Sequence, residues 1–470
     1  MKMKRPCILV YNPISGHGHL DSWNAMFITT LLGKGWDVLA LTPDVPALLS
    51  RLAQKGMANS PHLHVLDHNA SVTDIGWLAL RTRLQRTWQW WNVFGDRYFY
   101  RRPDSETTPG MPFLPYWRTR LFQKVVPFLF RASHFLYARY RRLHKTPEIT
   151  NDGADLEAGY LNPVDFATRI RAALRKSPLK PDLVFNMYMD MYMSSTDSWN
   201  KFSALNRWPW AGIRFVPADF PVERYYALSS LRGMCFLDEN ICRIYQEKIP
   251  NKSFEYLPDI TETALPDQPS ALAQEIRQRA AGRKIVFMGG SIGAQKNLAR
   301  WYELIALADP RQWFFVQVGE LHRGALTAED TVALEKVMSC PPENILLKDE
   351  YLQDERAFND VIRTADVIFA VYRNFRISSN MLNKAAAFER PILVADNHLM
   401  GERVRTYGIG KTVPQNDANL IYGALMSLDE AATLNDSFEQ YRKDFGINAL
   451  EINLTRFIER CIANRFMGSH

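Results

Sequence analysis

Two glycine-rich stretches follow short apolar runs and hold residue types that could bind an anion. The first, "PISGHGHL" at residues 13–20, contains Gly16, Gly18 and His19. The second, "FMGGSIGAQKNL" at residues 287–298, contains Gly290 and Lys296. Glycines let backbone N–H groups approach a ligand, and a helix N-terminus attracts negative charge. The second stretch therefore favours a phosphate site with Lys296 as a point charge, although a tight turn before a packed helix explains it equally well.

The helix of the second stretch is expected to begin directly after Ser291. The N–H groups around Gly290 and Ser291 would then face the anion. In the first stretch, the two glycines could approach a ligand closely, and His19 could act as a general base near neutral pH. The alternative is that its histidines are ordinary loop residues.

Another candidate anion site lies in "RNFRISSNMLNKAAAFERP" at residues 373–391. Ser378 or Ser379 can cap the helix expected there. Arg373 and Arg376 precede the cap, and a capped helix N-terminus beside two arginines suits an anion. An ordinary cap with solvated arginines is the alternative. Two such sites at the carboxyl ends of expected parallel strands favour a ligand at that edge.

Strands and helices alternate on both sides of these stretches. "CILVYN" at 7–12 and "WDVLALT" at 36–42 are expected strands, with apolar residues at helical spacing between them. The pattern breaks at about 75–160, returns with "PDLVFNM" at 181–187, and starts afresh with "KIVFMGG" at 284–290. Alternating strands and helices predict an α/β fold with two doubly wound parallel sheets.

The length of 470 residues and a Pro- and Ala-containing linker, "TETALPDQPSALAQ" at 261–274, indicate more than one domain. We expect an N-terminal Rossmann-like domain at 1–265 with an insertion at about 75–160. A second Rossmann-like domain is expected at 283–445. The last segment, 446–470, is expected to contain a helix that packs back on the N-terminal domain.

The expected insertion is both basic and aromatic. The chain carries a net charge of +7, yet residues 81–145 alone hold 14 Lys and Arg against three acidic residues, together with 16 aromatic residues. Such a surface is attracted to an anionic bilayer. A folded insertion with an aromatic core is the alternative, and a nucleic-acid surface is less favoured, so we expect no nucleic-acid partner. The residues expected to contact a membrane are Trp88, Trp90, Trp91, Lys124, Arg131 and Arg142.

Composition narrows the cellular setting. No apolar stretch approaches the ~18 residues of a membrane-spanning helix, and the opening residues suit a strand better than a signal peptide. The five cysteines are scattered and odd in number, which favours a reducing compartment and argues against a zinc site or a disulfide framework. We expect a cytoplasmic protein, peripheral at the cytoplasmic face of the membrane, with no metal site.

These stretches together resemble the GT-B glycosyltransferases, and most closely the retaining nucleotide-sugar transferases of the family 4-like group. "SGHGHLDSWNAMFITTLLGKGWDVLALTPD" is similar to the opening loop, helix and strand of that group. "GGSIGA" resembles the loop of the MurG-like, lipid-linked transferases, and "ADVIFAVYRNFRISSNMLNKAAAFERPILVAD" resembles the block that faces the diphosphate. The resemblance implies two Rossmann-like domains facing a cleft, and covers most of the chain outside about 75–160.

The resemblance also implies roles for particular residues. The lysine of the glycine-rich loop binds the nucleotide diphosphate in that family, and here it is Lys296. The donor would be a UDP-, GDP- or dTDP-sugar, and no cofactor is obligatory. The donor-binding residues so implied, together with those expected from the loops, are Gly16, Gly18, Gly290, Ser291, Lys296, Asn297, Arg373, Arg376, Ser378, Ser379, Asn380 and Lys384.

Three positions depart from the family pattern. The glutamate that holds the nucleotide ribose falls on Lys384, and the glycine near the same helix end falls on Glu389. A His-Asp pair is replaced by Ala218 and Asp219. A charged lysine cannot accept a hydrogen bond from a ribose hydroxyl, so Lys384 could instead contact a phosphate or pair with a donor carboxylate, as in a uronic acid.

The resemblance implies a transferase that moves a sugar from a nucleotide donor to an acceptor in cell-surface polysaccharide or glycolipid synthesis. The insertion suggests that the acceptor is lipid-linked or lies near the membrane. If the reaction inverts the sugar configuration, His19 or Asp219 is the candidate base; the sequence does not choose between inversion and retention. A GT-B epimerase or phosphorylase and a non-catalytic GT-B scaffold that binds a membrane or protein are the alternatives.

Overall fold

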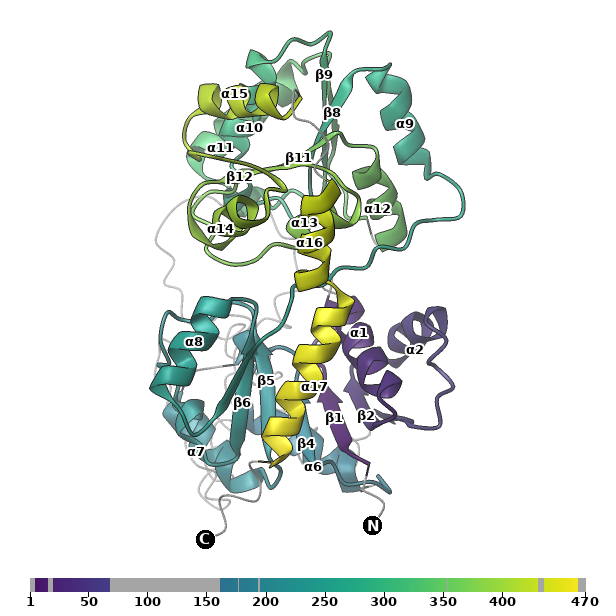
Figure 1. The fold of residues 1–470 in the computed structure, drawn as a ribbon, viewed down its shortest axis with the longest axis vertical. Coiled ribbons are helices and arrows are strands. Elements are labelled where there is room, and N and C mark those ends of the chain that lie inside the picture. The colour runs from purple at the N-terminus through teal and green to yellow at the C-terminus, as the bar shows by residue number, and fades with distance from the viewer. Residues whose placement is uncertain are drawn as a thin grey trace, which may run out of the picture. The chain divides into compact units, whose positions relative to one another are not determined.

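The computed structural model describes residues 5–15, 20–67, 161–175, 177–192, 195–352, 354–429 and 435–463. Within these ranges the chain forms two parallel β-sheets, each covered by helices (Figure 1). The residues expected to contact a membrane lie outside the described ranges, as do Gly16, Gly18 and His19. Their proposed roles stay predictions.

The N-terminal sheet has the strand order β3-β2-β1-β4-β5-β6-β7, and all of its pairings are parallel. The interior strand β1 pairs through Leu9 with Leu39 of β2 on one side and with Val184 of β4 on the other. The inner strands β1, β2, β4, β5 and β6 are short, mostly apolar runs that are almost wholly buried, as a parallel sheet covered on both faces requires. The strands are β1 (Cys7–Tyr11), β2 (Asp37–Thr42), β3 (Leu63–Asp67), β4 (Leu183–Asn186), β5 (Trp210–Arg214), β6 (Leu231–Phe236) and β7 (Ser253–Tyr256).

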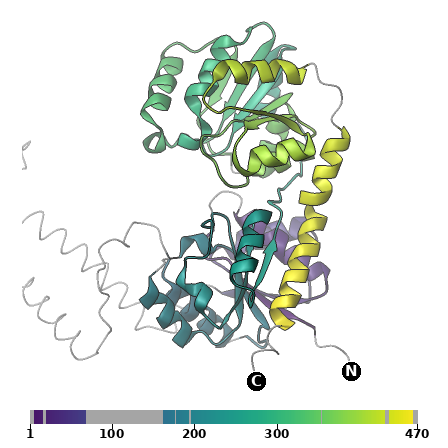
Figure 2. The same ribbon diagram turned by 60° about the vertical axis from the view of Figure 1, so that its left-hand side comes forward.

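Helices cover both faces of this sheet. One hydrophobic cluster joins the sheet to α1 (Leu20–Gly33), α2 (Val45–Gln54) and α17 (Ile447–Ala463). The opposite cluster joins it to α6 (Pro163–Arg175), α7 (Thr196–Leu205) and α8 (Glu239–Lys248). Figure 2 shows α17, in yellow, running along the N-terminal sheet. The last helix of the chain therefore completes the core of the domain that the first strand begins.

The C-terminal sheet has the order β10-β9-β8-β11-β12-β13 and is also wholly parallel. A hydrophobic cluster covers each face of this sheet. One cluster includes residues of α10, α11 and α15, and the other includes residues of α9, α12, α13, α14 and α16 (Figure 1). The strands are β8 (Lys284–Gly289), β9 (Trp313–Val318), β10 (Ile345–Lys348), β11 (Val367–Ala370), β12 (Ile392–Ala395) and β13 (Gly410–Val413). The helices are α9 (Ala271–Ala280), α10 (Leu298–Leu307), α11 (Ala328–Ser339), α12 (Glu355–Arg363), α13 (Asn380–Ala387), α14 (His398–Tyr407), α15 (Ala418–Asp429) and α16 (Asn435–Phe445).

Strand order reverses at one place in each sheet. The reversal lies between β1 and β4 in the N-terminal sheet and between β8 and β11 in the C-terminal sheet. The loops that leave the carboxyl ends of these strand pairs diverge to opposite faces, which opens a space where open α/β sheets bind ligands. Both doubly wound sheets were expected from the sequence, and the structure confirms this architecture.

Two absences concern the described ranges alone. None of their helices has the length and apolar character needed to cross a bilayer. The same residues contain no group of three or more His, Cys, Asp or Glu side chains placed to hold a metal ion.

Candidate anion-binding site in the C-terminal domain

The glycine loop after β8 is fastened to the neighbouring loop after β9. The N–H of Gly290 donates to the carbonyl of Val318 at 3.1 Å, and the N–H of Ile292 donates to Glu320 at 2.9 Å. Gly290 has a φ of +95°, a backbone conformation that favours glycine. A Cβ atom on Gly319 would lie 1.8 Å from the carbonyl oxygen of Gly290, so only glycine fits there. The close approach of these two glycines sets the shape of the loop.

The helix after this loop begins later than expected. A short 3-10 turn, Ala294–Lys296, comes first, and α10 starts only at Leu298. The reason is local: Gly293 is extended, and Asn297 adopts a left-handed conformation with φ 59° that interrupts a continuous helix. The expectation of a helix directly after Ser291 was therefore wrong. The Gly290 N–H already donates to the Val318 carbonyl. The N–H of Ser291, an exposed residue, is therefore the better candidate for a backbone contact with an anion.

Lys296 folds back over the carboxyl ends of β8 and β11. Its Nζ donates to the carbonyl of Gly289 at 2.9 Å and to the hydroxyl of Tyr372 at 2.8 Å. The same Nζ lies 4.2 Å from the centre of the Tyr372 ring, a distance at which a cation is attracted to the ring face. Tyr372 follows β11, which pairs with β8. A buried ammonium group therefore stands at the point where the strand order reverses.

Space for a ligand lies next to this ammonium group. If Gly290 carried a Cβ, the Lys296 Nζ at 3.8 Å would be the only atom within 4 Å of it among the described residues beyond its two chain neighbours. The absence of a side chain at Gly290 thus leaves open volume beside a positive charge. An anion could enter there and meet the lysine directly.

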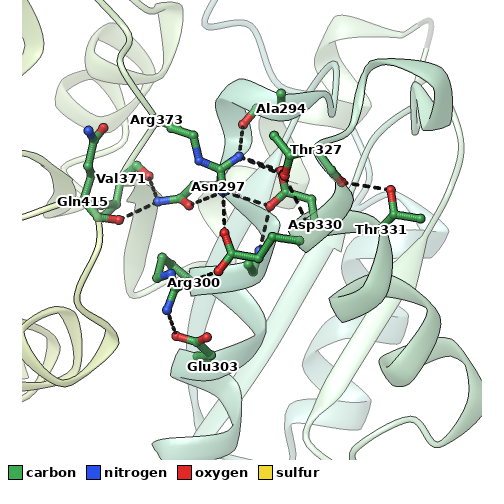
Figure 3. Close-up of polar contacts among 12 residues, drawn as sticks. Ala294, Asn297, Arg300, Glu303, Thr327, Asp330, Thr331, Val371, Arg373 and Gln415 are labelled. Atoms are coloured by element: carbon green, nitrogen blue, oxygen red, sulfur yellow. Dashed lines mark hydrogen bonds and ion pairs between the residues drawn. The ribbon is translucent and has the colours of Figure 1, made fainter.

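Arg373 does not present a free charge. Its guanidinium forms a two-bond pair with the carboxylate of Asp330, at 2.7 and 3.1 Å, and also donates to the carbonyl of Ala294 at 3.1 Å (Figure 3). Asp330, on α11, is fully buried. The sequence did not indicate this pairing, because the partner carboxylate lies 43 residues away. A contact between Arg373 and a donor stays a prediction. Arg373 holds the 3-10 turn against α11.

Charge pairing dominates the electrostatics of this cluster. Burial opposes ionisation of Asp330, but hydrogen bonds from Arg373, the Ala299 N–H and Thr327 outweigh it and hold the pKa of Asp330 below its ordinary value. The hydrogen bond to Asp330 in turn raises the pKa of Arg373. Both groups are therefore charged at neutral pH, and each neutralises the charge of the other.

Asn297 is likewise a structural residue. Its side-chain amide donates to the carbonyls of Val371 at 3.2 Å and Gln415 at 2.8 Å, and its oxygen accepts from Arg373 at 3.0 Å (Figure 3). All of its side-chain hydrogen-bonding groups are engaged, and the residue is 1% exposed. The Asn297 side chain therefore links the glycine loop to the segments that follow β11 and β13, and its amide is already hydrogen-bonded within the protein.

The second expected anion site is the N-terminus of α13. Ser379 is the cap, with its hydroxyl accepting from the Met381 N–H at 3.3 Å. The hydroxyl of the neighbouring Ser378 accepts from the guanidinium of Arg403 at 3.0 Å. The side-chain oxygen of Asn380 is buried and has no partner among the described residues. Of this group, Asn380 thus keeps an unused acceptor.

Lys384 is buried among polar partners. Its Nζ pairs with the Glu355 carboxylate at 2.7 Å, contacts the Asn359 side chain, and approaches the carbonyl of Glu262 at 3.4 Å. Burial lowers the pKa of the Lys384 amine, and the nearby Glu355 opposes this effect. Glu355 of α12 pairs with this lysine in the structure, and the expected contact of Lys384 with a donor phosphate or uronate stays a prediction.

Arg376 and Asp219 form an exposed pair. The guanidinium contacts both carboxylate oxygens, at 3.2 and 3.1 Å, and both side chains are more than 60% exposed. An exposed pair of this kind is weak and can be opened by a competing ligand. The structure thus brings together one predicted donor-binding cation and the predicted base Asp219.

Placement of the predicted residues divides them into two sets. Gly290 and Lys296 lie next to each other with the exposed Ser291 following Gly290 in the chain, while Arg373, Asn297 and Lys384 are occupied in structural contacts. Sequence reasoning missed Tyr372 and Gly319. Gly319 ends the apolar run "WFFVQVG", a strand followed by glycine that repeats the signal at Gly289 and Gly290. Tyr372 carried no signal, since its role depends on the pairing of β8 with β11.

Comparison with solved structures identifies the fold. An α,α-trehalose 6-phosphate synthase from Burkholderia multivorans aligns with a TM-score of 0.55 and 10% identity, covering 99% of this chain and 100% of the other. A glycosyltransferase from Rickettsia africae aligns at 0.52 with 10% identity, covering 97% and 99%. An Anabaena protein in complex with UDP and glucose aligns at 0.53 with 11% identity, covering 97% and 100%.

The chain has a GT-B fold. No protein-family model matches it, and no curated protein matches its sequence. The GT-B neighbours cover nearly the whole chain at about a tenth of identical residues, so the arrangement of the two Rossmann-like domains is what they share with it.

Proposed function

We propose that this GT-B protein is a glycosyltransferase that moves a sugar from a nucleotide-sugar donor to an acceptor. The observation that carries the proposal is the buried ammonium of Lys296 beside the open position at Gly290. Departure of a nucleoside diphosphate leaves negative charge on its phosphates, and a preorganised cation at that place stabilises the transition state. The Anabaena structure with UDP and glucose supports a UDP-sugar as the first donor to test.

Other residues have supporting roles in this proposal. The exposed N–H of Ser291 and the cap of α13 at Ser379 and Asn380 would surround the phosphates and the sugar. Arg376 would leave Asp219 to meet the donor, which would free the Asp219 carboxylate to accept the proton of the acceptor hydroxyl in an inverting reaction. In a retaining reaction, Asp219 would only orient the acceptor. His19 remains the other candidate base.

The acceptor is proposed from the sequence. The basic and aromatic residues between 81 and 145 favour a lipid-linked or membrane-proximal glycan at the cytoplasmic face of the membrane. The product would then belong to a cell-surface polysaccharide or glycolipid. No metal or cofactor is needed for the proposed charge stabilisation, because Lys296 and the surrounding polar groups supply it.

A nucleotide screen tests the proposal without knowledge of the acceptor. Thermal unfolding of the wild-type protein would be followed with UDP, GDP, dTDP, CMP and ADP. A ligand at 100 times its dissociation constant stabilises the folded state by ~2.7 kcal/mol. We expect one nucleoside diphosphate to stabilise the protein and Lys296→Ala to abolish most of that effect, since a charge-assisted hydrogen bond contributes ~1.5–3 kcal/mol.

The matched control is Lys411→Ala, at an exposed lysine on the edge strand β13. This variant should respond to the nucleotide as the wild type does. No stabilisation by any nucleotide would contradict the proposal and favour the non-catalytic scaffold. An equal response of Lys296→Ala and wild type would place the nucleotide elsewhere.

A further inference from the structure

The Lys296–Tyr372 pair has two polar hydrogen atoms without an acceptor among the described residues. An ammonium group has three N–H donors and no acceptor. Two of the three donors of Lys296 are directed at the Gly289 carbonyl and the Tyr372 hydroxyl. Because the lysine cannot accept, the Tyr372 oxygen must accept in this contact and its own hydrogen must point elsewhere. Among the described residues, neither that hydrogen nor the third N–H of the lysine has a partner.

Tyr372 is held firmly in this orientation. Its backbone N–H donates to the carbonyl of Ala370 at 2.8 Å, and its ring packs edge-on against Phe375 with ring centres 5.2 Å apart. The residue is 2% exposed and belongs to the core beneath α13. A rigid side chain keeps its hydroxyl in place at little entropic cost when a ligand arrives.

We propose that Tyr372 is a second anion-binding residue of this site, and that its hydroxyl accepts from Lys296 while donating its own hydrogen to a phosphate oxygen. The ligand class is a diphosphate, an identification that rests on the proposed function. Hydrogen bonds in a chain polarise one another, so a hydroxyl that accepts from an ammonium group becomes a stronger donor. Gly290 leaves the open volume in which the phosphate would stand.

A simpler role for the Tyr372 hydroxyl is to orient the Lys296 ammonium group by accepting its hydrogen bond, without contacting the ligand. Both roles predict that loss of the hydroxyl weakens anion binding, so a single variant does not separate them. They differ once Lys296 is removed. A hydroxyl that only orients the lysine then has no further effect, whereas a hydroxyl that donates to phosphate still contributes.

Calorimetric titration with inorganic pyrophosphate, in buffer free of divalent metal ions, separates the two roles. The variants are Tyr372→Phe, Lys296→Ala and the double variant, because phenylalanine keeps the ring and removes only the hydroxyl. We expect Tyr372→Phe to raise the dissociation constant about tenfold in the wild-type background. In the Lys296→Ala background it should still raise it by about 3- to 10-fold.

Tyr407→Phe is the matched control. It makes the same change in the same domain and also removes a hydrogen bond, the 2.8 Å contact of its hydroxyl with Asp444. Pyrophosphate binding by this variant should equal that of the wild type. Unfolding of each ligand-free variant would show whether the fold is retained.

Three results would overturn the inference. They are a wild-type protein that does not bind pyrophosphate, an unchanged affinity in Tyr372→Phe, and an unchanged affinity on adding Tyr372→Phe to Lys296→Ala. The outcome is separate from that of the nucleotide screen. Tyrosine-dependent binding of pyrophosphate without binding of any nucleotide would sustain the second anion-binding residue and refute the donor site. Nucleotide binding that is unchanged in Tyr372→Phe would support the donor site and refute Tyr372 as an anion-binding residue.

Discussion

Lys296, Arg373 and Lys384 differ in whether a carboxylate of the protein neutralises their positive charge. Lys296 donates to two neutral acceptors, a carbonyl and a hydroxyl, and forms no ion pair with a carboxylate among the described residues. Arg373 and Lys384 each face a carboxylate, Asp330 and Glu355. Sequence position indicated that all three could meet an anion. The carboxylates that neutralise two of them come from other helices, and only the folded chain reveals them.

Removal of Asp330 tests this division of roles. Asp330→Asn should lower the free energy of unfolding by about 3 kcal/mol at neutral pH, because it removes the buried counter-charge of the Arg373 guanidinium and leaves only the exposed Glu329 at 3.7 Å. The pKa of Asp330 is lowered in the folded state, so its stabilising contribution is present above the unfolded pKa of ~3.9 and disappears as the pH falls through the folded value. Urea unfolding at neutral and acidic pH measures both effects.

The corresponding controls use both partners. Asp330→Asn should lose less stability than wild type on acidification, and the losses in Asp330→Asn and Arg373→Met should not add in the double variant. Parallel acid profiles for wild type and Asp330→Asn, or additive losses, would show that the pair does not stabilise the 3-10 turn.

At the scale of elements, the strands were more predictable than the loops that join them. Continuous apolar runs such as "KIVFMGG" and "ADVIFAVY" predicted the buried parallel strands β8 and β11, because burial on both faces leaves a signal along the run itself. The 3-10 turn at Ala294–Lys296 and the left-handed Asn297 left no such signal. Their geometry depends on contacts with Val371, Gln415 and Arg373, residues far away in the sequence, so the start of α10 was misplaced.

The contact between the loops after β8 and β9 yields a prediction at this scale. Gly319→Ala would place a Cβ 1.8 Å from the Gly290 carbonyl oxygen, so the glycine loop must shift. We expect this variant to lose nucleoside diphosphate binding at least tenfold, as a displaced loop moves Lys296 from the open position. Calorimetric titration with the nucleotide found in the screen provides the measurement.

Gly324→Ala is the matched control for this change. Gly324 lies in the next turn, Arg323–Ala325, where a Cβ meets nothing within 4 Å among the described residues. It should bind the nucleotide normally. Normal binding by Gly319→Ala as well would mean that the two loops do not set the geometry of the site.

At the scale of the whole molecule, the two ends of the described chain share one core. Leu450, Leu454, Phe457 and Ile458 of α17 lie in the same hydrophobic cluster as Ile8 of β1. Their spacing of four, three and one residues is that of a helix with one buried face. A helix that packs back on the N-terminal domain was expected at 446–470, where the structure has α17. The sheet face that this helix covers follows only from the strand order.

Truncation of one α17 side chain should destabilise the N-terminal core. Phe457 is fully buried and packs edge-on against Phe185 of β4, with ring centres 6.2 Å apart. Phe457→Ala should lower the free energy of unfolding by about 3–5 kcal/mol. Chemical denaturation followed by circular dichroism gives the change, and Ile452→Ala, at a 58% exposed position of the same helix, is the control. Equal small losses for both variants would show that α17 contributes little to the core.

The two doubly wound sheets and the position of the glycine loop followed from sequence patterns, whereas the family resemblance implied the GT-B fold and a diphosphate at Lys296. The choice of which cations remain free, the role of Tyr372 and the need for Gly319 required the tertiary contacts. A crystal structure of the protein with the nucleoside diphosphate that stabilises it most tests the central claim directly. The account predicts the diphosphate over Gly290, with its oxygens within about 3 Å of the Lys296 Nζ. A diphosphate bound anywhere else, with the Lys296 Nζ left on Gly289 and Tyr372 alone, would contradict it.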